Sequence, residues 1–164
     1  MRHWLCVTGY HNWTVIEQKN VWGVDERYNI TMERYVSFGD GICFYVKPDN
    51  RAGLPYKTES RGWKSSIAGT FQTKKHGDKC CYFEDVDIGW IDPQGKPKSY
   101  PYRVDLERTD MPKAPIAFNQ QLKEELVFIT DKTKTWGPFV FPSMVLIPEE
   151  DFATLRSWIR RTWQ

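Results

Sequence analysis

The sequence is poor in the residues that build common catalytic and metal sites. Only three histidines occur in 164 residues, and His3, His11 and His76 are scattered along the chain. The chain has no His-x-x-x-His metal pair, no GxSxG turn around a nucleophilic serine and no glycine-rich phosphate loop. We therefore predict a protein that is not an enzyme and that needs neither a metal ion nor a cofactor.

Cysteine is also scarce and carries no recognisable pattern. Cys6 and Cys43 lie within apolar runs that are typical of strands, and Cys80 and Cys81 are adjacent. No CxxC spacing and no cysteine–histidine spacing suited to zinc occurs. The sequence indicates reduced thiols rather than a disulfide framework.

Long hydrophobic runs are missing. No apolar stretch approaches the roughly 18 residues that would suggest a membrane span. The N-terminus lacks the apolar segment followed by small residues that marks a secretory signal. We expect a soluble, cytoplasmic protein without membrane contact, and the length predicts a single domain over residues 1–164.

Aromatic residues, in contrast, are abundant, at 15% of the chain with eight tryptophans. Several of these lie beside glycine rather than within periodic apolar runs, namely Trp22, Trp63, Trp90 and Trp136. A nucleobase stacked on an indole gains about 1–3 kcal/mol, whereas an isolated tryptophan is more often a core residue. For Trp22, in the run NVWGV, both interpretations stand.

The net charge of +2 does not by itself predict nucleic-acid binding. The basic residues gather in polar segments with glycine or threonine, which are typical of loops. They are either a solvated surface or contacts to a nucleic-acid backbone. These residues include Lys57, Arg61, Lys64, Lys74, Lys75, Lys79, Lys132 and Lys134.

Short runs rich in β-forming residues predict strands over residues 4–8, 42–46, 67–73 and 100–107. The second of these should be central in its sheet. Gly69 in mid-strand predicts a bulge or a close approach of other atoms. The last strand should point its charged residues outward and its apolar residues inward.

Helices are expected between and after these strands. Asn12 is positioned to cap a helix over residues 13–19, and a second helical piece is expected within 27–36. Pro115 fits the first turn of a short helix that ends near Leu122 or Leu126. The clearest helix follows Pro148, with acidic residues in its first turn and an apolar stripe of Phe152, Leu155 and Ile159. The layout predicts an α+β domain around a small barrel.

Five stretches of the chain resemble one known family. They are HWLCVTGYHNWTVIEQKNVWGV, FGDGICFYVK, IAGTFQ, YPYRV and KTWGPFVFPSMVLIPEEDF, in this order. Together they resemble an EVE domain, a member of the PUA-like superfamily that is related to YTH domains. The resemblance implies a PUA-like β-barrel of about six strands with flanking helices. It also implies a pocket that reads a modified base in DNA or RNA.

The resemblance also implies which residues form that pocket. Trp22 looks like the tryptophan that opens the aromatic cage of YTH domains, and Asn12 matches an early Asn-Trp pair. Tyr45 lies on the strand that leads into the pocket, while Trp90 and Tyr82 are candidates for the second wall. Contacts to the nucleic-acid backbone are expected from Lys47, Arg61, Lys64, Lys74, Lys75, Lys132 and Lys134.

These observations favour a non-catalytic reader that accepts a flipped or single-stranded modified base, and a methylated base is the expected ligand. Its partner would be DNA or RNA carrying the modified base. It could serve a McrBC-type restriction system with an AAA+ motor and a nuclease. On this hypothesis Trp22→Ala should abolish the preference for modified bases and leave the fold intact.

Three alternatives stay open at this level. The first is an RNA-binding PUA-like module without preference for modified bases. The second is an enzyme acting on nucleotides through Glu84, Asp85 and Asp87, although a solvated acidic loop is the simpler interpretation of that group. The third is a partner-binding domain whose aromatic residues only fill the core.

Overall fold

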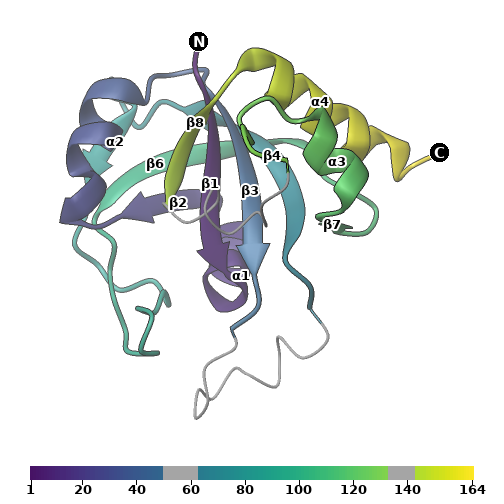
Figure 1. Ribbon diagram of the computed structural model, residues 1–164. Helices are drawn as coiled ribbons and strands as arrows, with labels where there is room; N and C mark the ends of the chain where they lie inside the picture. The colour runs from purple at the N-terminus through teal and green to yellow at the C-terminus, as the bar shows by residue number, and fades with distance from the viewer. Residues whose placement is uncertain (50–62, 133–142) are drawn as a thin grey trace.

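The computed structural model describes residues 1–49, 63–132 and 143–164, which form one mixed sheet and four α-helices (Figure 1). The sheet curls into a half-barrel. Its strands are β1 (His3–Gly9), β2 (Val21–Val24), β3 (Gly41–Lys47), β4 (Ser66–Lys74), β5 (Cys81–Phe83), β6 (Tyr102–Asp110), β7 (Ile116–Ala117) and β8 (Met144–Ile147). The helices are α1 (Tyr10–Lys19), α2 (Asn29–Tyr35), α3 (Gln120–Glu125) and α4 (Glu149–Arg161), with a short 3₁₀ turn at Glu26–Tyr28.

Six strands form the main path of the sheet, in the order β2-β6-β4-β3-β1-β8. The short strands β5 and β7 pair with β6 and β4. This confirms the predicted α+β, PUA-like barrel of about six strands. The β1–β3 pair is parallel, with Gly9 opposite Lys47, so both strands end at the same edge of the sheet.

The sheet is buried on both faces. On β3, Phe44 and Val46 pack into one cluster with Trp13 of α1, whereas Cys43 and Tyr45 pack into a second cluster under α3 and α4. Figure 1 shows α3 and α4 together on one flank of the sheet, away from α2. Because both faces are covered, the central strands appear in the sequence as continuous apolar runs.

Three of the predicted strands are confirmed as β1, β3 and β4, with β3 between the other two. The irregularity at Gly69 is confirmed as well. The register between β3 and β4 shifts there, since Phe44 pairs with Gly69 and Tyr45 with Ile67. A Cβ on Gly69 would lie 2.5 Å from Sδ of Met111, so the Met111 side chain would have to move to admit one.

The predicted helix boundaries agree less well with the structure than the predicted strands do. Helix α4 is confirmed, with Pro148 preceding it and the predicted stripe buried. Helix α2 lies within the expected range. The prediction that Asn12 caps a helix is wrong, because α1 already begins at Tyr10 and Asn12 lies inside it. The helix expected from Pro115 is present as α3 and ends at Glu125, near Leu126 as predicted. Its predicted start is wrong, because Ile116 and Ala117 pair with β4 as β7 and Asn119 caps α3.

The strand predicted over residues 100–107 is confirmed as β6, although it begins at Tyr102 and continues to Asp110. The predicted orientation of its charged residues fails at Arg103. Arg103 was expected to point outward, yet its side chain is only 2% exposed. The segment that connects β5 to β6 folds over it and accepts its hydrogen bonds.

No helix in the described part of the chain has the length and apolar character that a membrane span requires. Among the same residues, no group of three or more His, Cys, Asp or Glu side chains is placed to hold a metal ion.

Candidate functional site

A cavity of about 480 Å³ opens at the sheet edge where β1 and β3 end. Its volume falls in the range of small-ligand pockets, about 300–1,000 Å³. Most of the lining comes from segments that are distant in sequence: the end of β1, residues 22–28 in and after β2, residues 47–49 after β3, and residues 90–100. The parallel β1–β3 pair brings the first and third of these together. Asn12 of α1 and Ser143 complete the lining.

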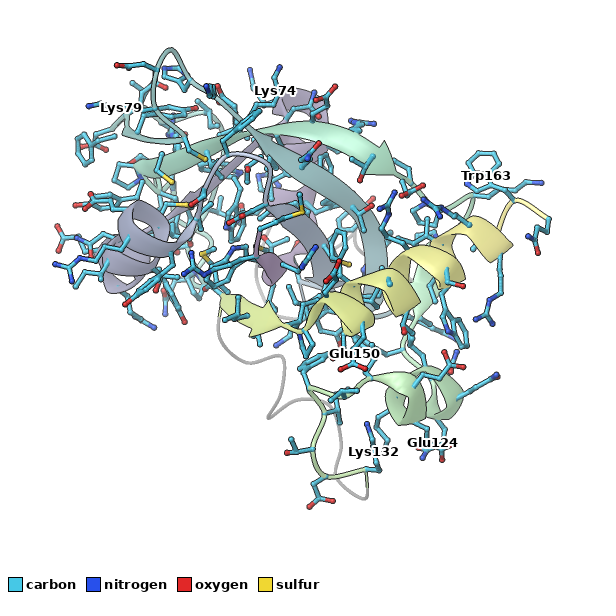
Figure 2. All side chains as sticks on the ribbon, turned by 90° about the horizontal axis from the view of Figure 1, so that it is seen from above. Lys74, Lys79, Glu124, Lys132, Glu150 and Trp163 are labelled. Carbon is cyan, nitrogen blue, oxygen red and sulfur yellow. The ribbon has the colours of Figure 1, made fainter. Side chains whose placement is uncertain are left out.

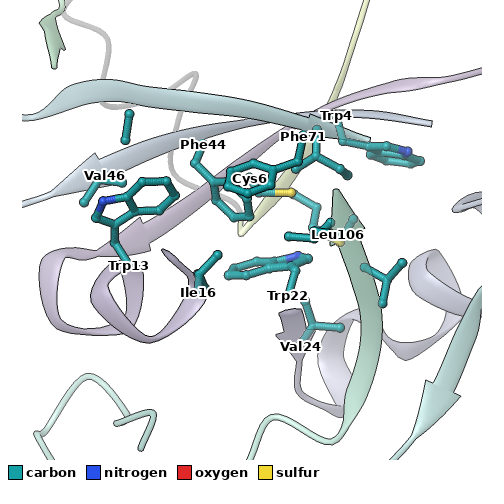
Figure 3. Packing of buried hydrophobic residues seen from close by; sticks show 14 of the residues in the cluster. Trp4, Cys6, Trp13, Ile16, Trp22, Val24, Phe44, Val46, Phe71 and Leu106 are labelled. Carbon is teal, nitrogen blue, oxygen red and sulfur yellow. The ribbon is translucent and has the colours of Figure 1, made fainter. Parts of the chain in front are cut away.

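Two tryptophans line this cavity, Trp22 from β2 and Trp90 from the segment before β6. Trp22 is 6% exposed and packs edge-on against Phe44, with 5.4 Å between the ring centroids (Figure 3). Trp90 is 2% exposed and lies edge-on to Tyr100 at 6.0 Å. Trp22 is therefore a core residue and a cavity wall at once.

The indole N–H groups of Trp22 and Trp90 are buried and have no hydrogen-bond acceptor among the described residues. A buried donor without an acceptor costs about 1–3 kcal/mol. Both rings line the same cavity, so a molecule bound there would pack against indole surface.

Charged side chains surround these rings. Lys98 Nζ lies 2.9 Å from Asp25 Oδ2 and stands over the ring of Tyr100, 4.8 Å from its centroid. Burial alone would raise the pKa of Asp25, but hydrogen bonds from Lys98 and from the N–H of Arg27 outweigh it and lower the pKa. Burial lowers the pKa of Lys47. The cavity thus combines cations that suit phosphate with carboxylates that accept hydrogen bonds.

Asn12 also lines the cavity, but its amide is engaged by the protein. Its Nδ2 donates to the carbonyl oxygen of Ile91, and its Oδ1 accepts from the N–H of Ile91, both at 2.9 Å. Asn12 therefore holds the segment that carries Trp90, instead of offering its amide to a ligand.

The structure does not bring Tyr45 and Tyr82 to this cavity. Side chains alternate along a strand, so Tyr45 faces the second core and packs against Phe118, with ring centroids 4.6 Å apart. Tyr82 stacks on His76 and donates its hydroxyl to Asp105 Oδ1 at 2.6 Å. It lines a separate groove with Met32, Cys80 and Cys81.

The predicted backbone contacts fall into several groups. Lys47 lines the cavity. The start of β4 lies beside the end of β3, so the exposed Lys64, just before β4, is at the cavity end of the sheet. Lys74 and Lys75 lie at the other end, because β4 runs antiparallel to β3. Figure 2 shows Lys74 far from Lys132, whose Nζ donates to the carbonyl oxygens of Lys123 and Leu126. The predictions for Arg61 and Lys134 fall outside the described residues.

Sequence reasoning missed several residues of the site. Arg27, Lys98 and Tyr100 line the cavity but belong to no recognisable motif. The charged run 25–27, which follows the stretch NVWGV, is the one local signal. Lys98 and Tyr100 reach the cavity only because the segment before β6 folds back over β2, and nothing in their spacing reveals this.

The family model for the EVE domain matches residues 2–158. The chain belongs to the EVE domain family. The UPF0310 protein PYRAB08750 of Pyrococcus abyssi is 33% identical over 159 residues, which cover 96% of this chain and 99% of that protein. The UPF0310 protein PH1033 of Pyrococcus horikoshii is 29% identical and covers 93% of this chain and 94% of its own length.

Solved structures share the fold of this EVE domain at low sequence identity. Human THYN1, solved in complex with DNA containing 5-methylcytosine, matches with a TM-score of 0.56 and 17% identity. That match covers 96% of this chain and 97% of THYN1. The YTH domain-containing protein mmi1, solved as an RNA complex, matches with a TM-score of 0.56 and 10% identity, over 99% of this chain and 88% of mmi1.

Proposed function

We propose that this EVE domain is a non-catalytic nucleic-acid-binding module that accepts one flipped or single-stranded base in the cavity of Trp22 and Trp90. One observation carries the proposal. Two indoles from distant segments, Trp22 of β2 and Trp90 of the segment before β6, line one cavity. A nucleobase offers a flat face that packs against indole rings.

A modified base, and a methylated one in particular, fits this cavity better than a plain base. A methyl group placed against indole surface buries apolar area, and one such group is worth about 1–3 kcal/mol in discrimination. The complex of human THYN1 with 5-methylcytosine DNA supports this choice of ligand class for a shared fold. The phosphates on either side of the base would contact Lys47 at the rim.

Calorimetric titration of the whole chain tests the proposal. The ligands are four oligonucleotides of one sequence, as DNA and as RNA, each with cytosine or 5-methylcytosine at the central position. We expect measurable binding at low salt and an affinity about 5- to 100-fold higher for the methylated form of one polymer. Absence of binding to all four at low salt would overturn the proposal.

A second candidate is an RNA-binding module that ignores modification. The mmi1 RNA complex with the same fold favours RNA as a ligand class. Equal affinities for methylated and plain RNA, both above those for DNA, would identify this function.

The enzyme alternative has less support. Asp85 accepts a hydrogen bond from Ser99, Glu84 lies 3.6 Å from Arg103, and neither lines the cavity. An AAA+ motor or a nuclease as partner stays a prediction from the family resemblance.

A further inference from the structure

The segment that joins β5 to β6, residues 84–101, forms one wall of the cavity. We call it the cavity loop. It contributes Trp90, Lys98 and Tyr100 to the lining. It has some order of its own, since the N–H of Lys98 donates to the carbonyl oxygen of Trp90 at 3.0 Å and the N–H of Asp92 donates to that of Lys96 at 2.8 Å.

The two arms of the cavity loop meet at one buried side chain, Arg103. Its Nη2 donates to the carbonyl oxygen of Val86 on the outgoing arm and, at 2.8 Å, to that of Ser99 on the returning arm. Its Nε donates to the carbonyl oxygen of Tyr100 at 3.3 Å. The guanidinium therefore ties together chain segments 13 residues apart.

The same guanidinium lies against the indole of Trp90, with Cζ 5.2 Å from the ring centroid. Trp90 thus has the cation of Arg103 against its ring and the backbone of Gly23 beside its edge. A charge that is 98% buried is costly unless its donors are used. Its carboxylate partner, Glu84, is 50% exposed and 3.6 Å away, so backbone carbonyls make the closer contacts.

We propose that Arg103 is a positioning residue that closes the cavity loop and fixes the indole of Trp90 as the second wall of the base-binding cavity. This inference rests on the proposed function for its effect on binding, but its effect on the loop is independent of any ligand. The planar fork is essential, because one guanidinium reaches both arms and still presents its face to an aromatic ring. A lysine ammonium keeps the charge but cannot do both.

The test compares the whole wild-type chain with Arg103→Lys and, as a matched control, Glu84→Gln. The first readout is amide hydrogen exchange of the free protein, followed separately for residues 84–101 and for β1 and β3. For Arg103→Lys we expect about tenfold faster exchange in the cavity loop and unchanged exchange in the two strands. Glu84→Gln should resemble the wild type in both regions, because its carboxylate is half exposed.

The second readout is the affinity for whichever of the four oligonucleotides binds the wild type best. If the loop is closed for only about a tenth of the time in Arg103→Lys, the affinity falls about tenfold. Unchanged exchange in the loop, or equal acceleration in loop and strands, would overturn the positioning role. The same role would be overturned if Glu84→Gln accelerated exchange in the cavity loop as much as Arg103→Lys does. If the wild type binds no oligonucleotide, the proposed function fails, while the exchange data still decide the role of Arg103.

Discussion

The indole of Trp90 rests on the backbone of Gly23. A Cβ added to Gly23 would lie 2.6 Å from Cζ3 of Trp90 and 2.5 Å from the carbonyl oxygen of Tyr100. The residue beside Trp22 must therefore lack a side chain for the second tryptophan to approach. This contact joins β2 to the cavity loop and brings two indoles, 68 positions apart in the sequence, to one cavity.

Gly23→Ala should push the cavity loop away from β2. The backbone oxygen of Tyr100 cannot move without the loop, so we expect the free energy of unfolding to fall by about 1–3 kcal/mol. Urea unfolding measures this loss, and titration should show weaker binding of the preferred oligonucleotide. Gly77→Ala is the control. No atom lies near its added Cβ, and its φ of +66° should cost stability without affecting binding.

Trp22→Phe should weaken binding and reduce the preference for a modified base, since the smaller ring leaves part of the cavity wall open. We expect a loss of about tenfold in affinity, measured by calorimetric titration. Trp163→Phe is the matched control, because Trp163 is 64% exposed, does not line the cavity and donates to the carbonyl oxygen of Met111. Equal losses in both variants would contradict the assignment of Trp22.

Trp22→Ala is a different experiment, and the expectation that it leaves the fold intact does not fit the structure. Trp22 packs against Phe44 inside the larger core cluster. Removing the indole should lower the free energy of unfolding by about 3–5 kcal/mol. Chemical denaturation followed by circular dichroism measures this change. A loss below about 1 kcal/mol would mean that Trp22 contributes little to the core.

Lys47→Gln should reduce the salt dependence of binding. If Lys47 contacts a phosphate, the slope of log K against log salt concentration falls in magnitude by about 0.7–0.9. Lys75→Gln should leave the slope unchanged, because Lys75 lies past the end of β4 that is remote from the cavity. The measurement is a titration series between about 50 and 200 mM salt. If Lys75→Gln reduced the slope and Lys47→Gln did not, the nucleic acid would lie at the other end of the sheet.

Asp25→Asn should destabilise the protein at neutral pH but not in acid. The pKa of Asp25 is lowered from its ordinary value of 3.8, because the hydrogen bonds from Lys98 and Arg27 outweigh burial. Its stabilisation is therefore complete above pH 3.8 and is lost as the pH falls through the folded value. We expect a difference of about 1 kcal/mol or less at pH 7 that disappears below that window. Thermal unfolding from pH 7 to pH 2 measures it, with the exposed Asp78→Asn as control.

The elements that could be predicted from the sequence are those whose pattern is local. Strands β1, β3 and β4 are apolar runs bounded by glycine or charged residues, and the caps and stripe of α4 lie within one short window. Membership of the EVE family was indicated by five ordered stretches and is confirmed by the match over residues 2–158. Trp22, Trp90 and Lys47, which the family resemblance implies as binding residues, line one cavity, and their role in binding stays a prediction.

Only the tertiary structure decided which surroundings several side chains have. Tyr45 and Phe44 are neighbours of similar character, and only the burial of both sheet faces assigns them to different cores. The alternating pattern of β6 predicts that Arg103 is exposed, yet the cavity loop covers its side chain and accepts its hydrogen bonds. Such outcomes depend on contacts between segments far apart in the chain. Periodicity reports which residues share a face, but it does not report what packs against that face.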